Sequence, residues 1–233
     1  MRRVSFWSRL TDLIVPRSCG ACGARLTESE QVLCARCNLH LPRTGYASNA
    51  YDNEMATLFW GRIAIERCAA WFFYQAASQS SRIIYELKYN DRPEYAHQLG
   101  MTMASELLST GFFDGIDLII PIPLTRRRQR QRGYNQSIEI AQGIHETTGI
   151  HVNSRIVTRT SFTGSQTQKD RWQRADNVEG VFRLRQAEAV QGRHVLIVDD
   201  VVTTGATICS CASEIAKAGD VRFSVLALGF SKS

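Results

Sequence analysis

Two adjacent acids, Asp199 and Asp200, precede a cluster of threonines and a glycine in the stretch VLIVDDVVTTGAT. The four apolar residues before them, Val195 to Val198, predict a strand buried on both faces, as parallel sheets require. A helix should follow directly, so that the amides from Thr203 to Thr207 converge at its amino end, where unpaired donors and the helix dipole favour an anion. Carboxylates suit sugar hydroxyls or a hydrated magnesium ion. The stretch therefore predicts a sugar-phosphate site.

Four of the seven cysteines form two C-x-x-C pairs, Cys19 with Cys22 and Cys34 with Cys37. Two such pairs can complete a tetrahedral cage of thiolates around zinc. The alternative is a pair of disulfides, which a reducing cytoplasm disfavours. Four thiolates leave no open position for catalysis, so we predict a structural zinc ion that holds a small ribbon over residues 17–45.

Composition and charge set broader limits on the function. The net charge of +6 favours polyanionic or phosphate-bearing partners, although solubility alone could account for it. No run approaches the roughly 20 apolar residues of a membrane span, and the first residues lack the apolar core of a secretory signal. We therefore expect no membrane span and a cytoplasmic location. Residues 1–16 have helical apolar spacing, typical of an amphipathic helix that docks on its own protein or, alternatively, on a membrane surface or partner.

From about residue 60 to residue 233 the chain alternates between strand and helix patterns, which predicts an α/β domain with a mostly parallel sheet and flanking helices. Residues 43–60 lack periodicity and suggest a connecting segment. We expect a helix over 80–90 capped by Ser80 or Ser81. The expected strands are 68–75, 117–123, 155–159, 195–200 and 221–230, and the other expected helices are 93–111, 135–149 and 205–219. Ligands of such sheets bind at the carboxyl ends of strands, where the acid pair lies.

The chain resembles the ComF/GntX family, phosphoribosyltransferase-like proteins linked to natural competence and DNA uptake. The resemblance covers nearly the whole chain, since the family's motifs occur in order: PRSCGACG, CARC, ELKYNDR, IIPIPL, RQRGYNQS, SQTQKDRWQRADNVEGVF and VLIVDDVVTTGAT. It implies an N-terminal zinc ribbon and a fold like that of the type I phosphoribosyltransferases.

The resemblance also implies roles for individual residues. The acid pair would hold the ribose hydroxyls of phosphoribosyl pyrophosphate, the threonine loop its 5'-phosphate, and the turn at Arg132 and Gly133 its pyrophosphate. The implied donor-binding set is Asp199, Asp200, Val201, Thr203, Thr204, Gly205, Ala206, Thr207, Arg132 and Gly133. The implied catalytic set is Asp199, Asp200, Arg132, Lys169 and Arg171, with magnesium, under a mobile flap at 161–177 that also carries Arg174.

Five of the seven residues from Arg126 to Arg132 are arginine. They could neutralise pyrophosphate, bind a nucleic-acid backbone with Tyr134 and Trp172 as stacking surfaces, or form a solvated face. Two functions therefore stay open. One is phosphoribosyl transfer to an unidentified acceptor, which residues 60–110 or the ribbon would contact. The other is a non-catalytic module that keeps the ligand pocket and serves single-stranded DNA import, beside a DNA-uptake helicase.

Overall fold

The computed structural model describes residues 17–160 and 180–232. Its centre is a five-stranded parallel sheet of order β1-β7-β6-β2-β3, which confirms the predicted α/β class. The strands of this sheet are β1 (Arg67–Phe73), β2 (Leu118–Pro121), β3 (His151–Val152), β6 (His194–Val202) and β7 (Arg222–Phe230). The helices are α2 (Ala35–His40), α3 (Glu54–Thr57), α4 (Gln79–Tyr89), α5 (Pro93–Leu107), α6 (Arg126–Arg132), α7 (Gln136–Thr148) and α8 (Ala206–Ile215).

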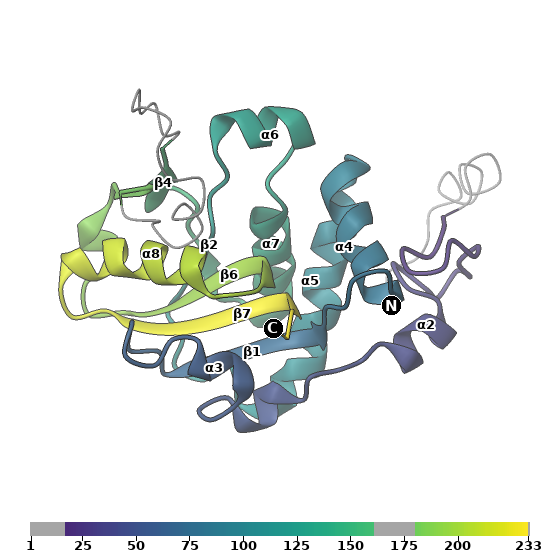
Figure 1. Cartoon of the computed structure of the whole chain (residues 1–233), viewed down its shortest axis with the longest axis horizontal. Coiled ribbons are helices and arrows are strands. Elements are labelled where there is room, and N and C mark those ends of the chain that lie inside the picture. Colours follow the sequence, from purple (N-terminus) through teal and green to yellow (C-terminus); the bar gives the residue numbers. More distant parts are fainter. Residues whose placement is uncertain (1–16, 161–179, 233) are drawn as a thin grey trace, which may run out of the picture.

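Alternate residues of the central strand face two separate apolar clusters, so the sheet is the middle of three layers. Leu196 and Val198 of β6 belong to a cluster with buried residues of α4, α5 and α7. Val195 and Ile197 belong to a second cluster with buried residues of α3 and α8. Because both faces are covered, β6 is apolar without alternation, as the sequence pattern indicated. In Figure 1, α4, α5 and α7 lie on one side of the strands and α8 on the other.

The strand expected over 155–159 is present, but it lies outside the central parallel sheet. The strand there is β4 (Val157–Arg159), which pairs antiparallel with β5 (Phe182–Leu184) as a separate two-stranded sheet. Its apolar residue, Val157, is buried, but Thr158 and Arg159 are only partly buried. A strand with this pattern can cover one face of a core, whereas a strand inside a parallel sheet must be buried on both.

The helix predicted over 80–90 begins earlier than expected, and its N-cap is Ser78 rather than Ser80 or Ser81. The Ser78 hydroxyl accepts hydrogen bonds from the amides of Ser80 and Ser81, at 3.2 and 3.4 Å. In return, the Ser81 hydroxyl accepts one from the Ser78 amide at 3.1 Å. The run of serines offers several possible caps, and this reciprocal pair satisfies two amides at once.

The segment 43–60, expected to be a connection, contributes two short helices and part of the core. A 3-10 turn (Tyr46–Asn49) and α3 lie in it, and Met55 and Phe59 are fully buried in the cluster under α8. The ribbon residues also join the core: Cys19, Leu33 and Cys37 belong to the same apolar cluster as α4 and α5. Within residues 17–160 and 180–232, no helix combines the length and apolarity that crossing a membrane demands.

Candidate functional site

The acid pair lies near the carboxyl end of β6, held by contacts from two distant helices. Asp199 accepts a hydrogen bond from the Ser137 hydroxyl of α7 at 3.1 Å and one from the Asp200 amide at 2.9 Å. Asp200 accepts one from the Val201 amide at 2.7 Å, and its other oxygen lies 3.0 Å from Nζ of Lys88 on α4. The two carboxylates therefore have different partners, one a hydroxyl and the other an ammonium group.

This difference has an electrostatic consequence for Asp199. Burial, and after it the adjacent Asp200 carboxylate, raise the pKa of the Asp199 carboxyl to about 7. The hydrogen bonds from the Asp200 amide and Ser137 lower this pKa, but they do not offset burial. Near neutral pH, Asp199 thus exchanges its proton readily. This suits a carboxyl that either binds sugar hydroxyls or becomes ionised when a cation lies beside it.

We expect this carboxyl to make the folding stability depend on pH. Because its folded pKa lies above the unfolded value of about 3.9, the folded state binds more protons between about pH 4 and 7, and stability falls as pH rises through that window. Asp199→Asn keeps an acceptor for Ser137 but cannot ionise. The unfolding free energy of the variant minus that of the wild type should therefore increase by on the order of 1–3 kcal/mol between pH 4 and pH 8. Urea unfolding of both proteins measures this difference. A difference that stays constant with pH would contradict the shift.

The loop after the acids forms a small cavity of about 40 Å³ at the amino end of α8. The cavity is lined by Asp199, Val201, Val202, Thr203, Thr204, Gly205, Ala206, Thr207 and Ile208. Thr203 and Thr204 are exposed, and among the described residues the amides of Thr204 and Gly205 have no hydrogen-bond acceptor. The loop therefore presents free amide donors at the N-terminus of α8, and anion binding there stays a prediction.

Residues before β1 support this loop, and the sequence did not indicate them. Gly205 has φ of +71°, and a Cβ there would meet the Phe59 ring at 3.0 Å. The Arg62 guanidinium donates a hydrogen bond to the Thr204 carbonyl at 2.9 Å. Gly205 is thus required both by its left-handed backbone and by the close ring. The signal for Phe59 and Arg62 was absent because their segment shows no periodicity.

The predicted pyrophosphate turn follows α6 and meets the turn between α4 and α5. Gly133 has φ of +80°, and a Cβ there would lie 2.2 Å from Oδ1 of Asp91. Arg132 donates a hydrogen bond to the Gln136 side chain at 2.8 Å. Tyr134, considered as a stacking surface, is buried and donates its hydroxyl to the Leu87 carbonyl at 2.6 Å. That role for Tyr134 was wrong, because its ring fills the core between α4 and α7.

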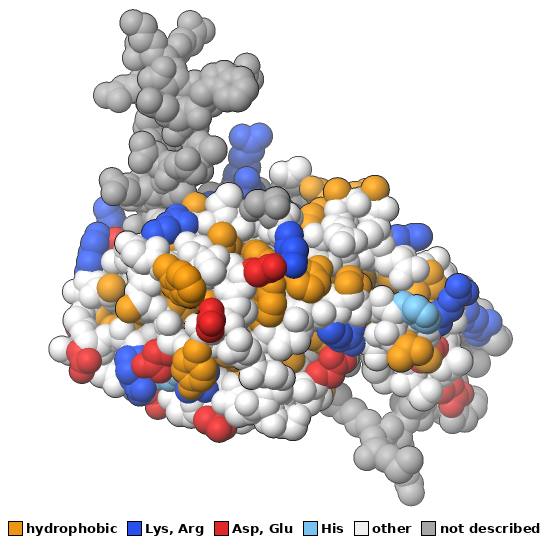
Figure 2. Space-filling view, turned by 60° about the horizontal axis from the view of Figure 1, so that its bottom comes forward, with side chains coloured by type: hydrophobic (Ala, Val, Ile, Leu, Met, Phe, Trp, Pro, Cys, Tyr) orange, Lys and Arg blue, Asp and Glu red, His pale blue; other side chains and the backbone are white. Residues whose placement is uncertain are grey.

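The other arginines of α6 are exposed. Among the described residues, no carboxylate forms an ion pair with Arg126, Arg127, Arg128 or Arg130. The helix stands apart from the layers in Figure 1. On the face drawn in Figure 2, Lys and Arg side chains lie in separate groups among Asp and Glu. Helix α6 therefore concentrates positive charge, whereas the Lys and Arg side chains on the face drawn in Figure 2 are scattered.

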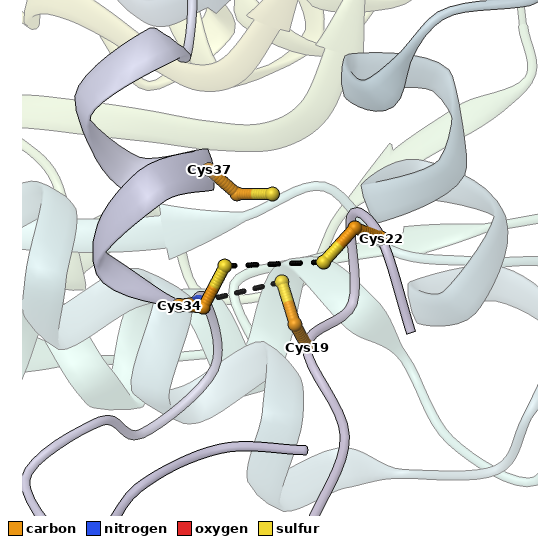
Figure 3. A group of neighbouring side chains, drawn as sticks. All are labelled: Cys19, Cys22, Cys34 and Cys37. Carbon is orange, nitrogen blue, oxygen red and sulfur yellow. Dashed lines mark hydrogen bonds between the residues drawn. The ribbon is translucent and has the colours of Figure 1, made fainter. Parts of the chain in front are cut away.

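The four ribbon cysteines come together as predicted, with their sulfurs directed toward one another (Figure 3). All four Sγ atoms lie within 4.8 Å of one another, and those of Cys22 and Cys34 are 3.8 Å apart. A tetrahedral zinc ion with bonds of about 2.3 Å separates its sulfurs by about 3.8 Å, so the cluster has the size of such a site. The Cys34 amide donates to Cys19 Sγ at 3.3 Å, as amides around bound thiolates do.

The Cys19 thiol ionises more easily than an ordinary cysteine. Burial opposes its ionisation, but the backbone amides of Cys34, Cys22 and Ala21 outweigh burial and lower its pKa to about 7. A thiolate is the form that binds metal. His40 is exposed, and its Nδ1 contacts the Arg36 carbonyl at 2.8 Å. Among the described residues, His40 does not belong to the cluster of possible metal ligands.

Two functional contacts were missed in the sequence, and both come from outside the recognised loop. Lys88, in the motif ELKYNDR, reaches Asp200, and Ser137, in RQRGYNQS, reaches Asp199. Their presence in family motifs was the available signal. The predicted N-terminal helix and the flap with Lys169, Arg171 and Arg174 lie outside the described residues.

Comparisons with known proteins identify a matching family and several relatives of the chain. Residues 98–228 match the family described as "Phosphoribosyl transferase domain". "DNA utilization protein YhgH" of Shigella flexneri is 32% identical over 204 residues, which cover 86% of this chain and 85% of that protein. "Competence protein F" of Haemophilus influenzae is 34% identical over 44% of this chain and 45% of that protein. A solved allosteric regulatory enzyme of purine biosynthesis has 21% identity and a TM-score of 0.41, over 61% of this chain and 29% of that chain.

Proposed function

From the premise that the chain belongs to the phosphoribosyl transferase domain family and groups with the ComF/GntX proteins, we propose that it binds phosphoribosyl pyrophosphate with magnesium. The observation that carries this proposal is the juxtaposition of the acid pair with the anion loop. Asp199 and Asp200 would accept hydrogen bonds from the ribose hydroxyls, while Thr203 to Thr207 would donate to the 5'-phosphate.

We further propose that the bound donor reacts by phosphoribosyl transfer to an acceptor. Such a transfer needs no covalent nucleophile, and Lys88 would serve by fixing the orientation of Asp200. Arg132 and Gly133 would receive the pyrophosphate, and Lys169 and Arg171 are proposed cations of the flap by family resemblance. Bound magnesium would neutralise charge on the leaving pyrophosphate. The thiolate cluster would hold one structural zinc ion, since its four sulfurs have the required spacing.

The test uses the full chain and takes two steps. Binding of phosphoribosyl pyrophosphate with magnesium is measured first, and release of pyrophosphate in the presence of a cell metabolite extract second. Release that depends on the extract supports transfer. Binding without any release rules out transfer under these conditions and favours a module that keeps the ligand pocket.

A second function, handling of single-stranded DNA beside a DNA-uptake helicase, is favoured by the unpaired arginines of α6. Two of the relatives carry names that refer to DNA utilization and competence. Exposed arginines on one short helix can bind successive phosphates and release counterions. This function does not require turnover at the acid pair.

Replacing Arg126, Arg127 and Arg128 with glutamine tests this second function. If α6 contacts the strand, affinity for single-stranded DNA should fall, and the slope of log affinity against log salt should flatten by about 2, because each phosphate contact on a single strand contributes about 0.7. The matched control replaces three other exposed arginines, Arg36, Arg155 and Arg193. If both triple variants lose the same affinity for single-stranded DNA, the effect comes from net charge and α6 is not a specific contact.

A further inference from the structure

A cavity of about 560 Å³ runs along α4 and has no assigned role in donor binding. It begins at Tyr74, which follows the carboxyl end of β1, and extends to Lys88 and Tyr89 at the last turn of α4. Its volume lies within the range of small-molecule sites. It is lined by Tyr74, Ala76, Ala77, Ser81, Arg82, Ile84, Tyr85, Lys88 and Tyr89.

Lys88 connects this cavity to the acid pair. Its side chain lines the cavity, and its Nζ lies 3.0 Å from Oδ2 of Asp200. The cavity and the proposed ribose site therefore share a wall. A ligand in the cavity would lie next to the sugar, which is where the acceptor of a phosphoribosyl group must be.

Two exposed aromatic rings lie along the cavity. Tyr85 and Tyr89 are one helical turn apart, with ring centroids 4.8 Å apart and planes inclined by 39°. They are 57% and 60% exposed, and within the described part of the chain neither hydroxyl has a hydrogen-bond partner. Adjacent exposed rings without polar partners offer a surface on which a planar ring can stack.

The charges around the cavity favour an anionic ligand. Its lining contains two cations and no carboxylate. Asp200 pairs with Lys88, but no carboxylate among residues 17–160 and 180–232 pairs with Arg82. The Arg82 guanidinium instead lies against the ribbon, where a Cβ on Gly23 would meet its Nη2 at 3.2 Å. A guanidinium with free donors can bind a carboxylate or phosphate through two parallel hydrogen bonds.

We propose that this cavity is the acceptor subsite and takes a planar ring that carries an anionic group, with the ring stacked on Tyr85 and Tyr89 and the anion bound by Arg82. This inference rests on the proposed transfer function. In the reaction, the acceptor atom donates an electron pair to C1 of the ribose. The bond from C1 to pyrophosphate breaks, and its electron pair leaves with pyrophosphate. An acceptor atom that carries a proton loses it to water, whereas a pyridine-type nitrogen carries none and becomes positively charged. The ring is either a free heterocyclic acid or the base of a nucleotide with its 5'-phosphate.

Binding of four probes to the full chain tests the proposal by calorimetry in the presence of phosphoribosyl pyrophosphate and magnesium. The first pair is pyridine-3-carboxylate and its neutral amide, and the second is thymidine 5'-phosphate and thymidine. At least one anionic probe should bind more tightly than its neutral partner. Preference for the carboxylate identifies a free acid, and preference for the nucleotide identifies a nucleic-acid source. Failure of both anionic probes to bind a chain that still binds the donor would overturn the proposal.

Three variants link the binding to the named residues. Tyr85→Leu with Tyr89→Leu keeps apolar area but removes both rings. This double variant should lower the affinity of the anionic probe about tenfold or more. Arg82→Gln should remove the preference for the anionic over the neutral partner. Tyr51→Leu, at another exposed tyrosine, should change nothing. All three variants should bind the donor as the wild type does. If the wild type does not bind the donor, the proposed function is refuted. If the double tyrosine variant binds the probe as tightly as the wild type, only the acceptor site is refuted.

Discussion

Phosphoribosyl pyrophosphate with magnesium is expected to raise the melting temperature of the chain by about 5–10 °C at a hundredfold excess over Kd, and Asp199→Asn with Asp200→Asn should abolish this rise. The isosteric change removes both ionisable carboxyls but keeps an oxygen acceptor at each position. The Ser137 hydroxyl and the Val201 amide thus retain partners. The variant should fold, because it loses the ion pair with Lys88 but also loses the cost of a buried carboxyl.

A matched double variant, Asp114→Asn with Asp220→Asn, separates site chemistry from net charge. Both residues are exposed and precede β2 and β7, at the amino ends of the strands, opposite the acid pair. Measured at pH 8, above the Asp199 pKa of about 7, this control has nearly the same change in net charge and should keep the full rise in melting temperature. If the wild type shows no rise with the donor, the sugar-phosphate site is refuted. A rise that survives in the Asp199 and Asp200 variant would place the donor elsewhere.

The contrast between Asp200 and Lys88 shows how far the sequence could predict this site. The acids and the threonine loop are continuous in the chain, and local rules of strand, turn and helix placed them correctly. Lys88 precedes Asp200 by more than one hundred residues, and their contact depends on how α4 packs beside β6. No local pattern encodes such a contact. The resemblance marked the segment that contains Lys88 but assigned the lysine no role.

The turn after the arginine-rich helix shows the opposite error. There the residue type of Tyr134 suggested a stacking role, but its ring is packed in the core. Tyr134 follows five arginines and an exposed helix, so a stacking ring was a reasonable hypothesis. The turn at Gly133 redirects the chain, and the tyrosine ring enters the core while its hydroxyl reaches the Leu87 carbonyl. The exposed rings instead lie on α4, at Tyr85 and Tyr89, where helical periodicity alone does not distinguish a solvent face from a binding surface.

The clustering of the ribbon cysteines was predictable, but the place of the ribbon in the core was not. The spacing of its cysteines predicted which four come together, whereas the docking of the ribbon depends on close contacts with distant helices. A Cβ on Gly20 would lie 1.8 Å from the Tyr95 hydroxyl of α5, so the ribbon backbone packs directly on that side chain. Cys19 and Cys37 are buried in the same cluster as Leu87 of α4. Unfolding of the ribbon should therefore destabilise α4, the helix that carries Lys88.

Metal analysis of the full chain is expected to give about one zinc ion per chain, and Cys37→Ser should remove it. Binding of a structural zinc ion contributes on the order of 10 kcal/mol to the folding of small thiolate sites, so its loss should unfold the ribbon. Because the ribbon shares its core with α4 and α5, the melting temperature of the whole chain should also fall, and donor binding should weaken through Lys88. Mass spectrometry, thermal unfolding and donor titration measure the three effects.

His40→Ala is the control for this prediction, because His40 is an exposed potential ligand beside the cluster that makes no contact with its sulfurs. This variant should keep its zinc, its melting temperature and its donor affinity. A wild-type chain that is folded, free of metal and unaffected by chelator would contradict the zinc site. If Cys37→Ser loses zinc but binds the donor with unchanged affinity, the ribbon holds metal without supporting α4. The path from the thiolate cluster through α4 to the acid pair would then be refuted, while the zinc site would stand.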